Sequence, residues 1–234
     1  MVTGATALIT VPAMIQFGIE PRTAIATNMV ILTMMSLGGA LPFLRGPEID
    51  RKRAPACIAL TIAGSTLGAL LVFVVPATWL PLMIPIAMVA VLVFLLINPR
   101  LGVRNEAPPT PGRIRTGYAA TLLLAIYGGF FSGGYVTLLI ATCVFFFGYS
   151  FLRAVVMSRV MNIASSLIAS CIFAWHHAID WKLSAILGTA AFLGGLAGGR
   201  WARRLPERLL RAVFITAVAA LAIKSLVFDL RGPR

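Results

Sequence analysis

Apolar runs about as long as a membrane is thick constrain this sequence more than any other feature. Residues 54–75 and 78–97 are each long enough to cross the hydrocarbon core of a bilayer as a helix. Of the 234 residues, 59% are hydrophobic and only 12% are charged, which is too little polar surface for a water-soluble domain of this length. The sequence therefore predicts an all-α polytopic membrane protein.

Nine apolar runs follow one another along the chain. The first, fifth and sixth are short, and with the glycines that interrupt this part of the pattern they predict broken or re-entrant helices. In order, the runs span residues 3–17, 22–44, 54–75, 78–97, 116–131, 135–147, 151–174, 184–202 and 210–228.

A connection rich in proline and arginine divides the runs. Residues 98–115 contain four prolines and four arginines, so this segment is expected to be an exposed linker outside the membrane. We therefore expect a first membrane repeat over 1–97, shortened at its N-terminus, the linker over 98–115, and a second repeat over 116–230 with an extra leading segment.

The two halves match when the chain is shifted by 130 positions. Ile49-Asp50 then falls on Ile179-Asp180 and Lys52 on Lys182, together with several Gly and Pro matches that chance does not explain. We expect two repeats of about four helical segments each. The other matched pairs are Gly4 and Gly134, Gly18 and Gly148, Ala24 and Ala154, Gly64 and Gly194, Gly68 and Gly198, and Pro76 and Pro206.

Positive charge is unequal between matching connections. Residues 45–53 carry four Lys or Arg and 175–183 carry one, whereas 75–77 carry none and 200–211 carry five. If 116–131 is an additional crossing, the second repeat is inverted, and fourteen of the 20 bases share one face, which would be cytoplasmic. Inverted repeats place a binding site near the midplane. A parallel arrangement stays open.

The net charge of +13 would suggest nucleic-acid binding in a soluble protein. Here most bases lie in short connections between apolar runs, where they set membrane topology, so we expect a lipid bilayer and no nucleic acid. The three cysteines lie in apolar runs without zinc-site spacing. ATPase, hydrolase and metalloenzyme motifs are missing, so we predict neither an enzyme nor a cofactor.

A glycine-rich segment, residues 127–134, interrupts the apolar stretch that contains the fifth and sixth runs. A break there leaves backbone N–H groups unpaired at the start of the next helix, which favours anion binding. Ser132, Gly133 and Gly134 are the candidate residues, and Gly4 is their counterpart in the first repeat. A packing kink is the alternative interpretation.

The helix after each break has polar residues in its first turns. These are Thr27 and Asn28 in the first repeat, and Ser158, Arg159 and Asn162 in the second. An arginine within the membrane is a functional-site hypothesis, and its guanidinium suits an oxyanion. The alternative is that Arg159 extends to the lipid headgroups.

Two further patterns have mainly structural explanations. His176 and His177, beside Trp175, Asp180 and Trp181, indicate an interfacial belt more than a metal site, so we predict no metal ligands. The small-residue patterns from Gly64 to Gly68 and from Gly194 to Gly199 permit close helix packing, either within the fold or in a homodimer.

The order of short motifs resembles the sulfite exporter TauE/SafE family of membrane permeases. The resemblance covers nearly the whole chain and implies transport of sulfite, sulfonates or related sulfur-containing anions across a bacterial cytoplasmic membrane. It rests on Gly4, Val11-Pro12, Gly18-x-x-Pro21-x-x-Ala24-x-Ala26-Thr27, Gly46, Ile49-Asp50, Gly148, Ala154, Ile179-Asp180-Trp181 and Arg203-Arg204-Leu205-Pro206.

The sequence therefore predicts a secondary transporter in the bacterial inner membrane whose substrate is a small anion. One alternative is a shortened, non-transporting relative that acts as a membrane partner or scaffold. Another is a cation or metal permease that uses the histidine pair and the interfacial acids, although no Asp or Glu lies deep within an apolar run.

Overall fold

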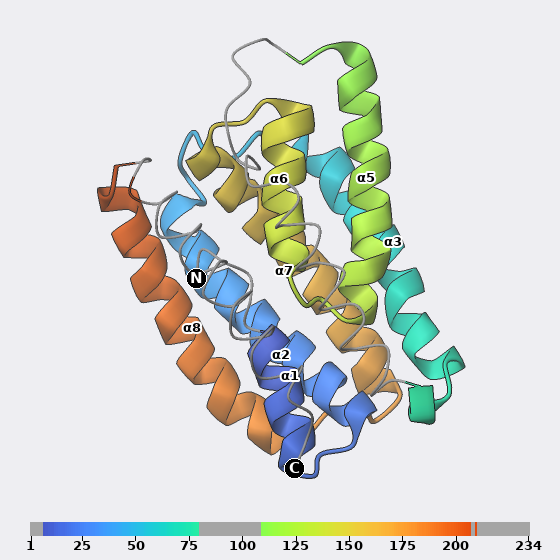
Figure 1. Cartoon of the computed structure of the whole chain (residues 1–234). Coiled ribbons are helices and arrows are strands. Elements are labelled where there is room, and N and C mark those ends of the chain that lie inside the picture. The colour runs from blue at the N-terminus through green and yellow to red at the C-terminus, as the bar shows by residue number, and fades with distance from the viewer. Residues whose placement is uncertain (1–6, 80–108, 207–208, 210–234) are drawn as a thin grey trace, which may run out of the picture.

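The computed structural model describes residues 7–79, 109–206 and 209, and every regular element in these ranges is helical (Figure 1). The predicted runs at 78–97 and 210–228 lie almost wholly outside the described residues. The elements are α1 (Ala7–Gln16), α2 (Pro21–Ala40), η1 (Leu41–Phe43), α3 (Ala54–Val74), η2 (Ala77–Trp79), α5 (Pro111–Phe130), α6 (Tyr135–Phe147), α7 (Phe151–Trp175) and α8 (Trp181–Arg204).

Four of the described helical segments are long and apolar enough to cross a membrane. They are Pro21–Phe43, Ala54–Val74, Phe151–Trp175 and Trp181–Arg204, and α6 is a shorter apolar helix. Large apolar side chains such as Leu67, Leu123 and Leu193 lie on the outside of the bundle, as expected where the surrounding solvent is lipid. These helices confirm the prediction of an all-α membrane protein.

Helix α7 lies at the centre of the bundle (Figure 1). It packs against α2, α3, α5 and α6, while α8 covers α2 and α5 covers α3. In the view of Figure 1, α2, α6 and α8 run upward, and α1, α3, α5 and α7 run downward. The two central helices, α2 and α7, are therefore antiparallel.

Glycines set the close approach of helices within the chain. A Cβ atom at Gly68 would come 2.0 Å from the Ile126 carbonyl oxygen of α5, and one at Gly195 would come 2.3 Å from the Met35 carbonyl oxygen of α2. Small residues permit this backbone contact in membranes. The two glycine patterns thus serve contacts inside the fold, and a homodimer stays a prediction.

The helix bounds recur at the offset of 130 residues. Helix α2 begins at Pro21 and α7 at Phe151, and α3 ends at Val74 and α8 at Arg204. The glycines that precede the two central helices, Gly18 and Gly148, both have a left-handed backbone, with φ of +84° and +66°. Equivalent residues therefore make equivalent turns. Helix α5 begins at Pro111, within the segment predicted to be a linker.

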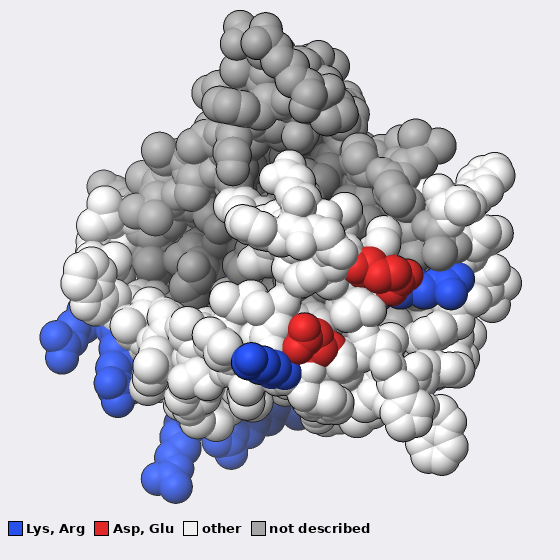
Figure 2. Space-filling model, turned by 90° about the horizontal axis from the view of Figure 1, so that it is seen from below, with Lys and Arg blue, Asp and Glu red and all other residues white. Residues whose placement is uncertain are grey.

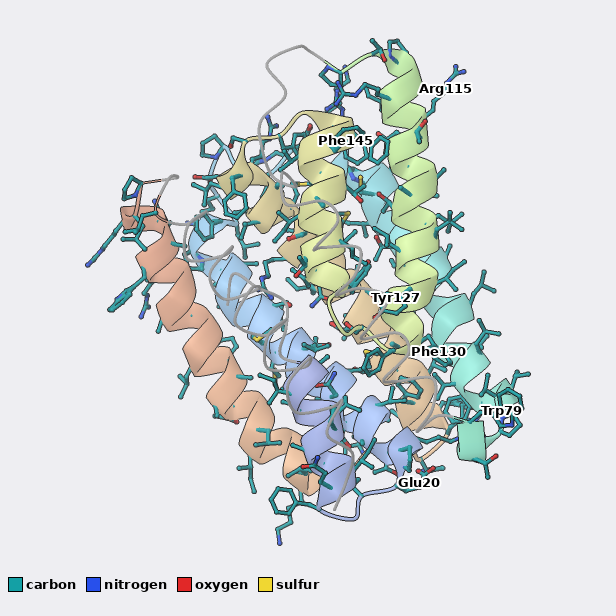
Figure 3. The ribbon with its side chains drawn as sticks, in the orientation of Figure 1. Glu20, Trp79, Arg115, Tyr127, Phe130 and Phe145 are labelled. Carbon is teal, nitrogen blue, oxygen red and sulfur yellow. The ribbon has the colours of Figure 1, made fainter. Side chains whose placement is uncertain are left out.

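Basic side chains gather at the end of the bundle where α3, α5 and α7 begin and α8 ends, which carries Arg115 in Figure 3. Arg153 pairs with Asp50 there at 3.5 Å, and Arg203 donates to the Pro42 carbonyl at 3.0 Å. We call this the basic end. The opposite end carries Glu20 in Figure 3, and Figure 2 shows acidic and basic side chains as neighbours on its otherwise uncharged described surface.

Candidate functional site

The glycine-rich segment between α5 and α6 is a sharp break inside the bundle. Ser132 and Gly134 have φ of +64° and +75°, a conformation that costs a non-glycine residue energy. The Tyr127 hydroxyl donates to the Gly133 carbonyl across the turn, and Ser132 is 3% exposed. Figure 3 places Tyr127 and Phe130 near the end of α5, above the level of Trp79. Helix α6 therefore begins within the height of the bundle.

Arg159 on α7 is the largest fully buried side chain of the described residues, with 1% of its surface exposed. None of its three guanidinium nitrogens has a hydrogen-bond partner among the residues that the structure describes. The side chain thus does not extend to the protein surface, in contrast to the alternative considered above. A buried charge without a partner is strongly unfavourable, so this position calls for a counter-ion.

The other predicted residues of α7 make contacts to neighbouring backbone and to α2. The Asn162 amide nitrogen donates to the Ser36 hydroxyl at 2.7 Å, and its Oδ1 has no partner in the described part of the chain. The Ser158 hydroxyl donates to the Val155 carbonyl of its own helix at 2.8 Å. Asn162 therefore retains a free acceptor, and the Ser158 hydroxyl proton is already engaged.

In the first repeat, the predicted residues face α1 and α8. The Thr27 hydroxyl oxygen accepts from the Asp180 backbone N–H at 3.1 Å. Thr10 on α1 donates to Asn28 Oδ1 at 2.6 Å, and Asn28 Nδ2 is buried without a partner in the described ranges. Thr27 thus positions the turn before α8. Gly4 lies outside the described residues.

The register of α2 against α7 separates the predicted residues into two sets. Thr33 donates to the Ser166 hydroxyl at 2.9 Å, next to the Ser36–Asn162 bond. Asn28 lies five residues before Thr33, and Arg159 lies seven residues before Ser166 on the antiparallel helix. At 1.5 Å per residue, their Cα atoms are about 18 Å apart along the bundle. Arg159 lies nearer the basic end and Asn28 nearer the opposite end.

Between these two sets lies a cluster of hydroxyl groups that sequence reasoning missed. Ser65 and Ser165 share a hydrogen bond of 2.6 Å between α3 and α7, and the Tyr135 hydroxyl faces Thr61 and Ser165. All four side chains are 0–1% exposed. We call Thr61, Ser65, Tyr135 and Ser165 the hydroxyl cluster. The four-residue spacing of Thr61 and Ser65 within an apolar run was the signal available in the sequence.

A second group of charged and aromatic residues joins the repeats at the basic end. Asp50 accepts from the Tyr149 hydroxyl at 2.8 Å and lies 3.5 Å from Arg153 and 3.9 Å from Arg53. Burial alone would raise the pKa of the Asp50 carboxyl, but hydrogen bonds from Tyr149, Arg53 and Lys52 and the charge of Arg153 outweigh it and lower the pKa. Asp50 is therefore a carboxylate that bridges the two repeats.

The histidine pair lies at the opposite end, and its contacts are aromatic. His176 stacks on Phe73 with ring centroids 4.0 Å apart, and Trp175 beside it is 84% exposed. Among the described residues, no three His, Cys, Asp or Glu side chains lie close enough together to hold a metal. This geometry fits an interfacial belt.

Comparison with known proteins decides the family. The model of the family described as "Sulfite exporter TauE/SafE" matches residues 1–225. The chain belongs to the TauE/SafE family. No solved structure matches it significantly.

Curated relatives agree with this assignment. A probable membrane transporter protein of Sinorhizobium sp., ORF9, is 27% identical over 96% of this chain and 86% of its own length. The Haemophilus influenzae probable membrane transporter protein is 25% identical over 97% of the chain and 89% of its own length. The Escherichia coli K12 protein YfcA, also a probable membrane transporter protein, is 26% identical over 99% and 85%. The chain is thus a member of a family of membrane transporters.

Proposed function

We propose that this TauE/SafE protein is a secondary transporter of small anions, with sulfite, sulfonates or related sulfur-containing anions as the substrate class. The observation that carries the proposal is the guanidinium of Arg159, which is buried and lacks a partner among the described residues. Arginine presents several N–H donors in a planar fork that matches the oxygens of an oxyanion. A bound anion would supply the missing charge and the missing acceptors together.

The distribution of acidic residues supports an anion over a cation. Within the described ranges, Glu20, Glu48, Asp50 and Asp180 all lie outside the helices. The described interior thus contains a fixed positive charge and no carboxylate, which disfavours a metal cation. It also provides no buried carboxylate as a proton relay.

The internal repetition supports an inverted repeat and alternating access. Helices α2 and α7 are equivalent by sequence offset and run in opposite directions (Figure 1). The packing of α1 on α2 matches that of α6 on α7, and the packing of α8 on α2 matches that of α3 on α7. Side chains at equivalent positions also accept equivalent bonds, from Asp180 N–H to Thr27 and from Asp50 N–H to Met157. Relative motion of two such units is a common transport mechanism.

The charge distribution supports an orientation in the bacterial inner membrane. Connections on the cytoplasmic side carry an excess of Lys and Arg. The basic end of the described bundle, with Arg53, Arg113, Arg153 and Arg203, would therefore face the cytoplasm. Arg159 lies in the half of the bundle nearer that end.

Flux measurements on the purified protein in liposomes test the proposal. The panel contains sulfite, sulfate, methanesulfonate and 2-hydroxyethanesulfonate, with protein-free liposomes as the control. We expect at least one of these anions to move faster through liposomes that contain the protein. A protein shown to be folded by size-exclusion chromatography and circular dichroism that moves none of them would support the scaffold alternative. Metal-ion flux without anion flux would support a cation permease.

A further inference from the structure

We propose that the hydroxyl cluster, Thr61, Ser65, Tyr135 and Ser165, is a second binding position for the substrate anion, which it recognises through neutral hydrogen-bond donors. The inference rests on the proposed anion transport, and it adds a set of residues and a type of recognition that Arg159 does not supply. The observation behind it is a pair of buried hydroxyl groups that face each other without a hydrogen bond.

The unpaired groups of this cluster are the Tyr135 hydroxyl and Thr61 Oγ1. Both residues are 0% exposed, and neither atom has a hydrogen-bond partner among the described residues. The two serines of the cluster are satisfied, because Ser65 Oγ and Ser165 Oγ lie 2.6 Å apart and Ser65 also donates to the Ala125 carbonyl at 3.1 Å. Leaving a buried hydroxyl unpaired is costly. The two free hydroxyls therefore mark the place where a ligand is missing.

Packing fixes the direction of the Tyr135 side chain. A Cβ atom at Gly128 would lie 2.9 Å from three carbons of the Tyr135 ring, so only a glycine at position 128 leaves room for the ring. The ring thus lies against α5, and the hydroxyl extends to Thr61 and Ser165 on the far side. The ring position would be retained in a variant that lacks only the hydroxyl.

The surroundings favour an anion over a cation in this position. Tyr135 is the first residue of α6, a 13-residue helix that begins inside the bundle. The N–H groups in the first turn of a helix lack partners within that helix and carry partial positive charge. Hydroxyl groups can donate as well as accept. Without a described carboxylate nearby, they would donate to the oxygens of an anion.

The hydroxyl cluster and Arg159 lie at different depths. Arg159 precedes Ser165 by six residues on α7, which corresponds to about 9 Å along the helix. An anion that enters from the basic end would reach Arg159 first and the hydroxyl cluster next. The charge of Arg159 attracts any anion, whereas the hydroxyl groups require a ligand with acceptor oxygens in defined positions. The cluster is therefore expected to select oxyanions from other anions.

Removing single hydroxyl groups tests this position. Tyr135→Phe and Thr61→Val keep nearly the same shape, and Tyr118→Phe and Thr66→Val are the matched controls. Thr66 lies on the same helix as Thr61, is exposed and donates to its own helix at Ile62. Binding of methanesulfonate and of thiocyanate, an anion without oxygens, is measured by titration calorimetry in detergent. Liposome flux of both anions is measured in parallel.

We expect Tyr135→Phe and Thr61→Val each to weaken methanesulfonate binding by about tenfold, since each removes one donor to a charged acceptor. Thiocyanate binding should change less than twofold, and both control variants should bind as the wild type does. Wild-type methanesulfonate affinity in both cluster variants would overturn the proposal while leaving anion transport intact. Equal losses for both anions would show a structural role, and stabilisation of the wild type by sodium without any anion would show a cation site. A wild type without anion flux would instead overturn the proposed function.

Discussion

Positions 29 and 159 are equivalent in the two repeats, yet the first repeat places Met29 there and the second places Arg159. Both side chains are buried, at 0% and 1% exposure. Met29 packs in the apolar cluster with Ala26 and Leu32, whereas the nitrogens of Arg159 have no partner in the described chain. The same position in the fold thus serves packing in one repeat and charge in the other. Any function that depends on a buried charge belongs to the second repeat.

The largest expected effect comes from making the second repeat like the first. Arg159→Met removes the buried charge and keeps an unbranched side chain, so we expect methanesulfonate affinity to fall at least tenfold. Thermal stability without anion should stay the same or rise, because replacing an unpaired buried charge with an apolar side chain removes a destabilising group. Titration calorimetry and thermal unfolding in detergent measure the two quantities.

The matched control for this variant is Arg115→Met on α5, because Arg115 is exposed at the basic end. It should leave both affinity and stability unchanged. An Arg159→Met variant that loses stability and keeps its affinity would show that the charge is structural.

A smaller effect is expected from the two aspartates that occupy equivalent positions before α3 and α8. Asp50 accepts from Tyr149 and pairs with Arg153, whereas Asp180 accepts from the Leu183 N–H at the start of α8. We expect Asp50→Asn to lower the free energy of unfolding by about 1–2 kcal/mol. Asp180→Asn should cost about 0.5 kcal/mol or less, since asparagine also caps helices. Denaturation with increasing SDS measures both.

The pH dependence of the Asp50 contribution has a defined sign. Its pKa in the folded protein is below the ordinary value of 3.8, so the carboxylate stabilises the fold above that value and loses its effect as the pH falls through the folded pKa. Between about pH 5 and pH 8 the wild type and Asp50→Asn should therefore differ by a constant amount. A difference that changes within this range would contradict the assignment of a lowered pKa.

The smallest effect separates the two left-handed glycines. Gly18→Ala and Gly148→Ala both place a side chain at positive φ, which costs about 1 kcal/mol. A Cβ atom at Gly18 meets nothing within 4 Å among the described atoms, whereas one at Gly148 would lie 3.2 Å from Pro109. Thermal unfolding should show a loss for both variants and a slightly larger one for Gly148→Ala. A larger loss at Gly18 would contradict the description of these two turns.

Much of the fold was predictable because membrane helices must satisfy their backbone internally and match the bilayer thickness. Run length alone predicted α2, α3, α7 and α8, and the glycine-rich segment predicted the break before Tyr135. The start of α5 at Pro111 was not predicted, since proline is tolerated in the first turn of a helix. Local composition cannot distinguish that start from a linker.

The candidate site was less predictable, because contacts between helices depend on their register. Arg159 was identified from its position among apolar residues, but its separation from Asn28 follows only from the Thr33–Ser166 and Ser36–Asn162 contacts. Tyr135 and Thr61 are ordinary residues of apolar runs in the sequence. Their unpaired hydroxyl groups became visible when α3, α6 and α7 were brought together.

The measurement that tests the central claim most directly is the electrical current on a solid-supported membrane when an anion is added. A jump in methanesulfonate concentration should produce a current in liposomes that contain the wild type, since the substrate carries its charge across the bilayer. The account predicts that this current is reduced at least tenfold in Arg159→Met and is unchanged in Arg115→Met. A full current in Arg159→Met, with the same protein content in the liposomes, would contradict the account.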